Sequence, residues 1–213
     1  MTKRIVIIGA GGFARETAWA IDDINAASGG NAYETVGFVV SDPSAVTERD
    51  SPVLEGFDWL EKHRAEFDSV AIGIGTPAVR LKVAEDLREL DFPPLIHPSV
   101  RYSSSCTFGR GVIVCAGVIC TVNVTVEDFV LVNLTCTIGH ESTIGAGTVI
   151  NPGVNISGGV KIGRGCLLGT GAQILQYVSI GDGGTVGAGA VVRKDVAEGS
   201  TVVGIPAAPI ARR

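Results

Sequence analysis

Residues 137–148 read Thr-Ile-Gly-His-Glu-Ser-Thr-Ile-Gly-Ala-Gly-Thr, two successive units of six residues in which isoleucine is followed directly by glycine. An apolar residue recurs at the isoleucine position every sixth residue from Phe108 to Val192, fifteen times without an insertion. Self-similarity at so short a period predicts a solenoid, in which each unit stacks on an equivalent unit further along the chain. Three hexads per coil give five coils, stacked at the roughly 4.8 Å spacing of hydrogen-bonded parallel strands.

Two positions of each hexad are expected to point to the interior of this solenoid. One is the apolar position, and the other lies four residues later, where Val112, Cys136 and Thr148 are examples of the small or β-branched side chains that suit a narrow interior. Glycine or asparagine often follows the apolar residue directly, as at Gly139 and Asn133. Because these residues most readily adopt a positive φ, we expect the corners of the coil there.

The first ninety or so residues have a different pattern. Short apolar runs alternate with amphipathic segments, in the order 4–8, 13–26, 35–40, 69–74 and 78–90. This order predicts a small parallel sheet with flanking helices. Asp91-Phe92-Pro93-Pro94 ends the last helix, because proline removes a backbone donor and restricts the residue before it. We therefore expect an α/β, Rossmann-like half domain at residues 1–94 and an all-β parallel β-helix at residues 95–213.

The composition is that of an ordinary soluble globular protein. The net charge is −5, and no run of Lys and Arg exceeds the pair Arg193-Lys194, so a nucleic-acid partner is not expected. Apolar stretches stay below the roughly 20 residues of a membrane span, and the chain opens without a signal-peptide pattern, so we expect a cytoplasmic protein. Five cysteines without Cys-x-x-Cys spacing fit neither a disulfide framework nor a zinc site, and are interpreted as small core residues.

A glycine-rich segment, Gly9-Ala10-Gly11-Gly12-Phe13, follows the first apolar run and opens the first amphipathic segment. Glycines between a strand and a helix let backbone N–H groups and the helix N-terminus hold a phosphate. A dinucleotide such as NAD is one candidate ligand. The region is only about half of a full Rossmann fold, which favours a smaller nucleotide.

The hexads match the repeat of the hexapeptide transferases: an aliphatic residue, then Gly, Ala, Glu or Asp, and a Ser, Thr, Ala or Val at the fifth position. With residues 5–12 in front and Gly204-Ile205-Pro206-Ala207 at the end, the chain most closely resembles bacterial nucleotide-sugar N-acetyltransferases and the related sialic acid O-acetyltransferases. The most specific elements are Ile138-Gly139-His140-Glu141 and Ala71-Ile72-Gly73 with Arg80. The resemblance implies a left-handed β-helix, acetyl-CoA as cosubstrate, a nucleotide-linked amino sugar as acceptor, and a homotrimer with active sites between subunits.

His140 is the histidine of the repeat region, at the third position of its hexad, which lies on a corner. An imidazole there could take a proton from an attacking amine or hydroxyl. The resemblance implies that His140 is the catalytic base and that Glu141 raises its basicity. Neighbouring side chains on an extended chain point to opposite faces, so only a turn would bring Glu141 to the imidazole. Asn133 is either a contact to the acceptor sugar, as the resemblance implies, or a left-handed turn residue.

The remaining site assignments concern the two substrates. We assign the acceptor to Gly9, Gly11, Gly12, Phe13, Asp42, Gly73 and Asn133, because a nucleotide diphosphate attached to a sugar suits the glycine-rich segment. The resemblance implies that acetyl-CoA lies along the coils, near the backbones of Thr170 and Ala188, one coil apart. Nine residues after the base, where many members carry a second histidine that binds the cofactor, this chain has Val149.

Other functions were considered for the same sequence. Gamma-class carbonic anhydrases share the repeat but use three histidines as zinc ligands, and this repeat contains only His140, so no metal is expected. A nucleophilic cysteine would need a paired base and a site that stabilises its thiolate. Acetylation of a sugar hydroxyl and a non-catalytic nucleotide-sugar binding scaffold stay open.

Overall fold

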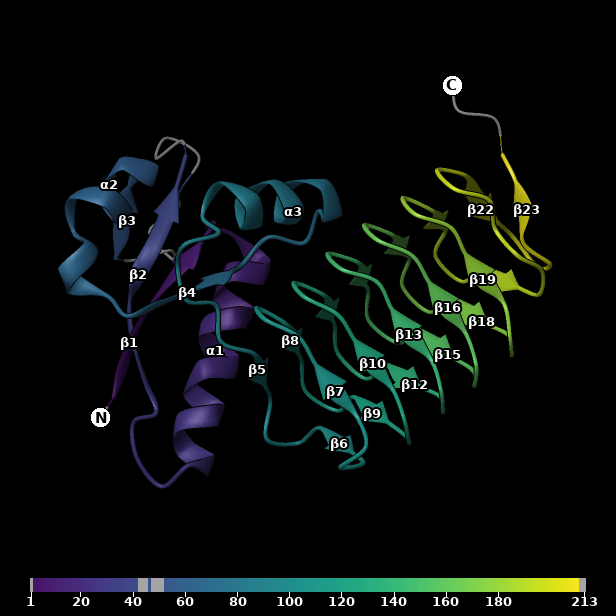
Figure 1. Cartoon of the computed structure of the whole chain (residues 1–213), viewed down its shortest axis with the longest axis horizontal. Helices are drawn as coiled ribbons and strands as arrows, with labels where there is room; N and C mark the ends of the chain where they lie inside the picture. Colours follow the sequence, from purple (N-terminus) through teal and green to yellow (C-terminus); the bar gives the residue numbers. More distant parts are fainter. Residues whose placement is uncertain (1, 42–45, 47–51, 211–213) are drawn as a thin grey trace.

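The computed structural model describes residues 2–41, 46 and 52–210. An α/β region stands against one end of a long β-helix (Figure 1). The α/β region consists of β1 (Lys3–Ile8), α1 (Gly12–Ala27), β2 (Tyr33–Val40), β3 (Val53–Glu55), α2 (Gly56–Lys62), a 3-10 turn (Arg64–Glu66), β4 (Ser69–Ile72) and α3 (Pro77–Asp86). None of the helices in the described ranges is long and apolar enough to cross a bilayer.

The four strands form one parallel sheet in the order β3-β2-β1-β4. Both faces of β1 are apolar, as expected of a central parallel strand. Ile5 and Ile7 pack on α1, whereas Val6 and Ile8 face the layer that contains residues of α2 and α3. The predicted α/β order is confirmed. Two details differ, because β3 and α2 were not assigned from the sequence, and α3 ends at Asp86 rather than Leu90.

Beyond Pro94 the chain forms two-residue strands six residues apart. They are β5 (Leu95–Ile96), β6 (Arg101–Tyr102), β7 (Thr107–Phe108), β8 (Ile113–Val114), β9 (Ile119–Cys120), β10 (Thr125–Val126), β11 (Leu131–Val132), β12 (Thr137–Ile138), β13 (Thr143–Ile144), β14 (Val149–Ile150), β15 (Asn155–Ile156), β16 (Lys161–Ile162), β17 (Leu167–Leu168), β18 (Gln173–Ile174), β19 (Ser179–Ile180), β20 (Thr185–Val186) and β21 (Val191–Val192). β22 (Thr201–Val203) and β23 (Ala208–Pro209) close the helix as an antiparallel pair.

Inner strands of the β-helix, such as β10, pair in parallel with the strands one full coil away in either direction. Thr125, for example, lies opposite Thr107 on one side and Thr143 on the other, each three hexads distant. The strands thereby form three sheets, one on each side of a triangular coil. The prediction of three hexads per coil is confirmed, and the fold is the predicted left-handed parallel β-helix. It begins with β5 and β6, two hexads before Phe108.

The interior of the β-helix is a continuous stack of the two predicted inward positions. The inward side chains between Val112 and Val202 form one buried cluster. Cys120, Cys136 and Cys166 belong to it, which confirms the interpretation of these cysteines as small core residues. Burying an aliphatic side chain of this size stabilises a fold by roughly 1.5–3 kcal/mol, so the stack is the main source of the stability of the β-helix.

The corners are not where the sequence analysis placed them. Positive φ occurs three residues after the apolar position, as at Gly147 (68°) and Gly183 (64°), whereas Gly145 does not have a positive φ. Glycine directly after the apolar residue serves a different purpose. A Cβ on Gly145 would lie 2.4 Å from the carbonyl carbon of Gly163 in the next coil. The coils therefore approach too closely for a side chain at this position.

The α/β region packs on one outer side of the β-helix. On the sheet that contains β8, β11 and β14, the outward side chains Ile113, Leu131 and Val149 are buried in one cluster with residues of β1 and α1. Elsewhere on the β-helix the equivalent outward positions include Thr125 and Lys161. The apolar outward residues recur once per coil, so they line a single side of the β-helix.

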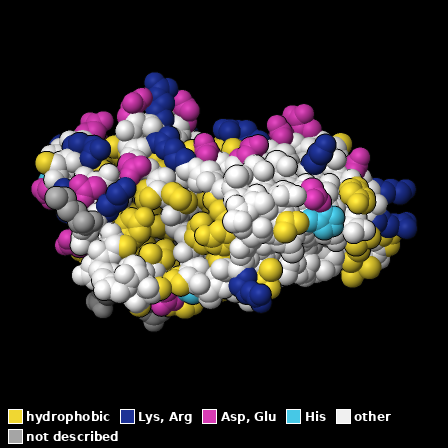
Figure 2. All heavy atoms as spheres, turned by 60° about the horizontal axis from the view of Figure 1, so that its bottom comes forward, with side chains coloured by type: hydrophobic (Ala, Val, Ile, Leu, Met, Phe, Trp, Pro, Cys, Tyr) yellow, Lys and Arg dark blue, Asp and Glu magenta, His cyan; other side chains and the backbone are white. Residues whose placement is uncertain are grey.

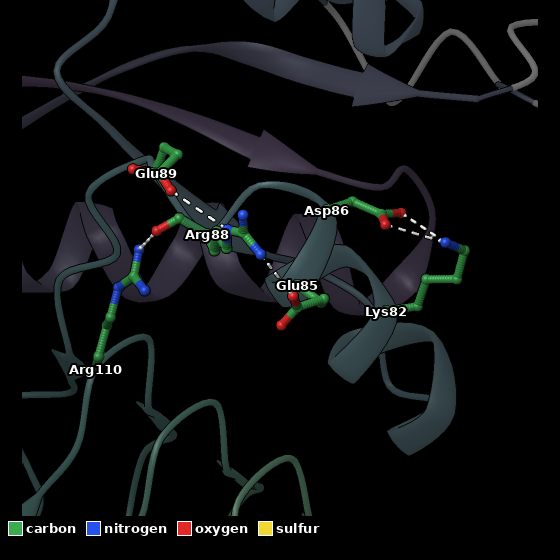
Figure 3. A network of polar contacts seen from close by, with 6 residues as sticks. All are labelled: Lys82, Glu85, Asp86, Arg88, Glu89 and Arg110. Atoms are coloured by element: carbon green, nitrogen blue, oxygen red, sulfur yellow. Dashed lines mark hydrogen bonds and ion pairs between the residues drawn. The ribbon is translucent and has the colours of Figure 1, made fainter.

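Two arginines connect the α/β region with the β-helix. Arg80 of α3 is fully buried, and burial lowers its pKa to about 10. Its guanidinium donates to the carbonyls of Ile72 (2.7 Å) and Ile74 (2.8 Å), and to that of Phe129 in the β-helix (3.1 Å). Arg110 of the β-helix donates to two carbonyls that follow α3, that of Arg88 (Figure 3) and that of Leu90. Both side chains thus hold α3 and the adjoining end of β4 against the β-helix.

Two glycine substitutions separate the two roles of glycine in the hexad. Gly183→Ala places a Cβ at an ordinary van der Waals distance, 3.9 Å from Cα of Gly199, but at a positive φ, which costs about 1–2 kcal/mol. Gly145→Ala meets the backbone of the next coil, and we expect a loss of about 3 kcal/mol, the upper end for overpacking. Denaturant unfolding of both variants measures the difference. An equal or smaller loss in Gly145→Ala would contradict the assignment of these positions.

Candidate active site

His140 lies on the corner between β12 and β13, with 43% of its side chain exposed. Its imidazole extends over the next coil and covers Gly158, where a Cβ would lie 2.3 Å from the ring. The coil also holds the backbone of His140, whose carbonyl accepts a hydrogen bond from the N–H of Gly159 (2.7 Å). The position of the ring therefore requires glycine at residue 158.

Glu141 reaches the imidazole through the turn that the sequence analysis required. Its φ of 55° brings the carboxylate back toward His140, and Oε2 of Glu141 contacts Nδ1 of His140. The hydrogen bond to His140, followed by one from Asn123, lowers the pKa of Glu141 below its usual value, so the carboxylate is charged at neutral pH. A carboxylate at Nδ1 holds the proton on that nitrogen, which leaves the lone pair of Nε2 free to accept a proton.

Exposed apolar side chains surround this corner. Val122 lies one coil before His140, and Leu175 and Tyr177 lie on the coil beyond Gly158. Figure 2 shows a surface histidine on the β-helix with acidic and hydrophobic side chains beside it. The ring of Tyr177 covers Gly159, next to the glycine under the imidazole. The corner therefore offers a base in a partly apolar setting, a combination suited to reaction with an uncharged amine or hydroxyl.

Three other predicted residues lie on a different corner, between the sheet of β11 and the sheet of β12. Asn133 is buried there, and its Oδ1 accepts a hydrogen bond from the N–H of Leu134 (2.7 Å). Asn133 does not have a positive φ, so its interpretation as a left-handed turn residue is wrong. Thr170 and Ala188 are exposed, and their N–H groups donate to no acceptor within the described residues. One chain therefore does not bring these residues to His140.

The assignment of Val149 to the cofactor is corrected by its burial. Its side chain is fully buried between β14 and the α/β region, in the cluster that includes Leu131 and Ile7. A side chain in that cluster packs against the protein itself and does not reach a ligand. The valine at this position is explained by packing of the two regions.

The predicted phosphate-binding segment lies at the carboxyl edge of the parallel sheet. Gly11 has a φ of 119°, and a Cβ added to Gly11 or Gly12 would meet no heavy atom within 4 Å, so both border open space. Gly9 and Gly73 are packing positions, since a Cβ on either would approach neighbouring atoms to 2.8 Å. Phe13, on the opening turn of α1, is partly buried and packs against the cluster around β1. Asp42 lies outside the described residues.

Beside this segment, a cleft of about 610 Å³ opens between α3 and the ends of β1 and β2. Its walls are mainly apolar and include Val40, Phe57 and Val79. At the cleft Lys82 and Asp86 form an ion pair of 3.0 Å on one face of α3 (Figure 3). The contribution of α3 to this cleft was not predicted, although the apolar residues of the helix are visible in the sequence.

Two alternative kinds of site were considered from the sequence, a nucleophilic cysteine and a metal centre. Burial raises the pKa of the Cys115 and Cys120 thiols to about 12 and that of Cys136 to about 11, which opposes formation of a nucleophilic thiolate. Burial also raises the pKa of Cys166. Within residues 2–41, 46 and 52–210, no three His, Cys, Asp or Glu side chains are grouped to hold a metal ion.

Two protein families match parts of the chain. The PglD N-terminal domain matches residues 4–87, and the bacterial transferase hexapeptide (six repeats) matches residues 159–194.

Solved structures match nearly the whole chain. PerB from Caulobacter crescentus, in complex with CoA and GDP-perosamine, is 30% identical with a TM-score of 0.88, covering 97% of each chain. The acetyltransferase domain of PglB from Neisseria gonorrhoeae, in complex with acetyl coenzyme A, is 30% identical with a TM-score of 0.85, covering 99% of this chain and 100% of the other. WeeI from Acinetobacter baumannii AYE is 27% identical with a TM-score of 0.86, covering 98% and 100%.

Alkylation of the folded protein checks the state of the cysteines. Four of the five thiols are buried, and Cys106 is partly exposed, so we expect iodoacetamide at pH 8 to add at most one group per chain. Intact-mass analysis counts the adducts, with the unfolded protein as the control that takes five. Rapid alkylation of a second thiol in the folded protein would reopen the nucleophilic-cysteine interpretation.

Proposed function

Because the chain belongs to the hexapeptide-repeat acetyltransferases that carry a PglD-type N-terminal domain, we propose that it transfers an acetyl group from acetyl-CoA to the amino group of a nucleotide-linked amino sugar. The observation that carries this proposal is the His140–Glu141 pair, exposed on a corner of a chain that aligns over 97% of its length with PerB. The binding-scaffold alternative is not retained, because the family is one of acetyltransferases.

The proposed reaction is a direct transfer. The sugar amine attacks the thioester carbonyl, so a C–N bond forms and the C–S bond breaks. Nε2 of His140 takes the proton that the amine loses and returns it to the departing sulfur of CoA. The Glu141 carboxylate stabilises the imidazolium that exists between these two steps, since it lies against Nδ1. A base of this kind contributes about 10²–10⁴-fold to a rate.

The α/β region is proposed to hold the nucleotide. The apolar walls of the cleft suit the faces of a nucleobase, and the uncrowded backbone at Gly11 and Gly12 suits a diphosphate at the N-terminus of the 16-residue α1. An amine acceptor is preferred over a hydroxyl because one of the similar solved structures is a perosamine N-acetyltransferase. The imidazole alone would serve either nucleophile.

A homotrimer is proposed as the working form. His140 lies on one corner of the coil, whereas the N–H groups of Thr170 and Ala188, which have no acceptor in the described chain, lie on another. A whole side of the β-helix separates the two corners. A second copy whose Thr170 corner faced His140 would complete the site, with the pantetheine amides on those N–H groups.

All five cysteines are free, which supports a reducing compartment such as the cytoplasm.

Replacement of the base tests the reaction. We expect His140→Asn to lower thiol release from acetyl-CoA by at least about 100-fold, because the amine proton loses its acceptor. The assay screens GDP-, UDP- and dTDP-linked amino sugars, with GDP-perosamine among them. His63→Asn is the matched control, since His63 stacks on Trp59 in the α/β region and should keep full activity. Full activity in His140→Asn would overturn the mechanism.

Subunit complementation tests the shared site. Light scattering should give about three times the chain mass of 22.0 kDa. We expect His140→Asn and Ala188→Trp each to be inactive alone, the second because an indole blocks the cofactor path. Co-expression of the two chains should restore part of the activity, since some sites then combine an intact His140 with an intact Ala188. A monomer in solution, or no recovery in mixed assemblies, would contradict the proposal.

A further inference from the structure

Non-glycine residues with a positive φ gather on the corner that carries His140. Five such residues occur in the described chain, and three of them, Asn123 (56°), Glu141 (55°) and Tyr177 (62°), occupy the same hexad position on this corner. Between residues 111 and 189, this position at the other two corners is glycine except at Phe129 and Thr135. Glutamate and tyrosine are strained at a positive φ relative to glycine, whereas asparagine tolerates this conformation best among residues with a side chain.

Asn123 lies one coil before Glu141 and directly beside it. Its Nδ2 donates to Oε1 of Glu141 at 3.3 Å, while Oε2 of the same carboxylate contacts His140. Each of the two carboxylate oxygens therefore has its own side-chain partner. The backbone of Asn123 is itself fixed, because its N–H donates to Oγ of Ser105 at 2.9 Å.

Glu141 needs such a partner because its side chain is 58% exposed. A glutamate at the surface has several rotamers of similar free energy, and fixing one costs conformational entropy. Only a rotamer that aims the carboxylate at Nδ1 keeps the imidazole proton there. An amide that donates to the far oxygen favours this rotamer and also the charged form of the carboxylate.

We propose that Asn123 is a positioning residue of the active site, which holds the Glu141 carboxylate so that His140 keeps its proton on Nδ1 and presents Nε2 to the acceptor. The kinetic consequence rests on the proposed function. The orientation of the two side chains does not, since it is a property of the protein without substrates.

Two substitutions remove the amide donor with little change of fold. Asn123→Gly relieves the positive φ, so the β-helix should be no less stable than before. Asn123→Asp keeps the shape of the side chain but replaces the donor by a second carboxylate, which repels Glu141. Thr135→Gly is the matched control, because Thr135 has the same hexad position and a φ of 57° on a neighbouring corner.

The first measurement uses the ring nitrogens of the three histidines in ¹⁵N NMR spectra of the protein without ligands. We expect the population of His140 with its proton on Nδ1 to fall in Asn123→Gly and further in Asn123→Asp, and to stay unchanged in Thr135→Gly. The second measurement is steady-state kinetics. We expect kcat to fall about tenfold, the value of one hydrogen bond to a charged group, with KM unchanged for both substrates.

The outcomes distinguish this inference from the proposed function. If His140→Asn keeps full activity but the NMR change is present, the mechanism fails and the positioning of Glu141 stands. If His140→Asn is inactive, and both Asn123 variants keep the wild-type tautomer and kcat, the positioning role is wrong. A fall in kcat without a change at the His140 ring would also overturn it, since Asn123 would then act in another way.

Discussion

From β5 to β21, in-register pairing of two-residue strands one coil of three hexads apart is the constraint on which the rest of the structure depends. Because these coils have the same length, residues at the same phase of successive coils lie above one another and form columns along the β-helix. The chemistry of the candidate site is arranged in these columns. Asn123 and Glu141 share one column, and His140 and Gly158 share the next. An insertion at a strand would break the pairing and displace every column beyond it.

The sequence predicts the β-helix well, because its signal repeats fifteen times and each repeat buries the same two positions. The corners were harder to predict, since glycine serves two physical purposes in the same hexad. At Gly147 it permits a positive φ, and at Gly145 it permits close approach of the next coil. Only the structure distinguishes these roles, because the two glycines look alike in the sequence.

Site residues were predictable where the chemistry is local and less so where it depends on tertiary contacts. The proximity of His140 and Glu141 needed only a turn. Val149 looked like part of the candidate site by its spacing from His140, yet the α/β region covers it. The cleft wall on α3 was missed for a similar reason, since Val79 lines a cavity only once the buried Arg80 fixes the helix against the β-helix.

The stacked coils also fix distances along the axis of the β-helix. Neighbouring coils are separated by roughly 4.8 Å, so the distance along the axis between two equivalent residues on the same corner is a whole number of these steps. Thr170 and Ala188 differ by one step on their corner. A duplication of one whole coil between His140 and Thr170 would lengthen the molecule by one coil spacing without changing either corner. The number of coils therefore sets the axial distance between two positions on the β-helix, and this distance can match the length of an extended cosubstrate.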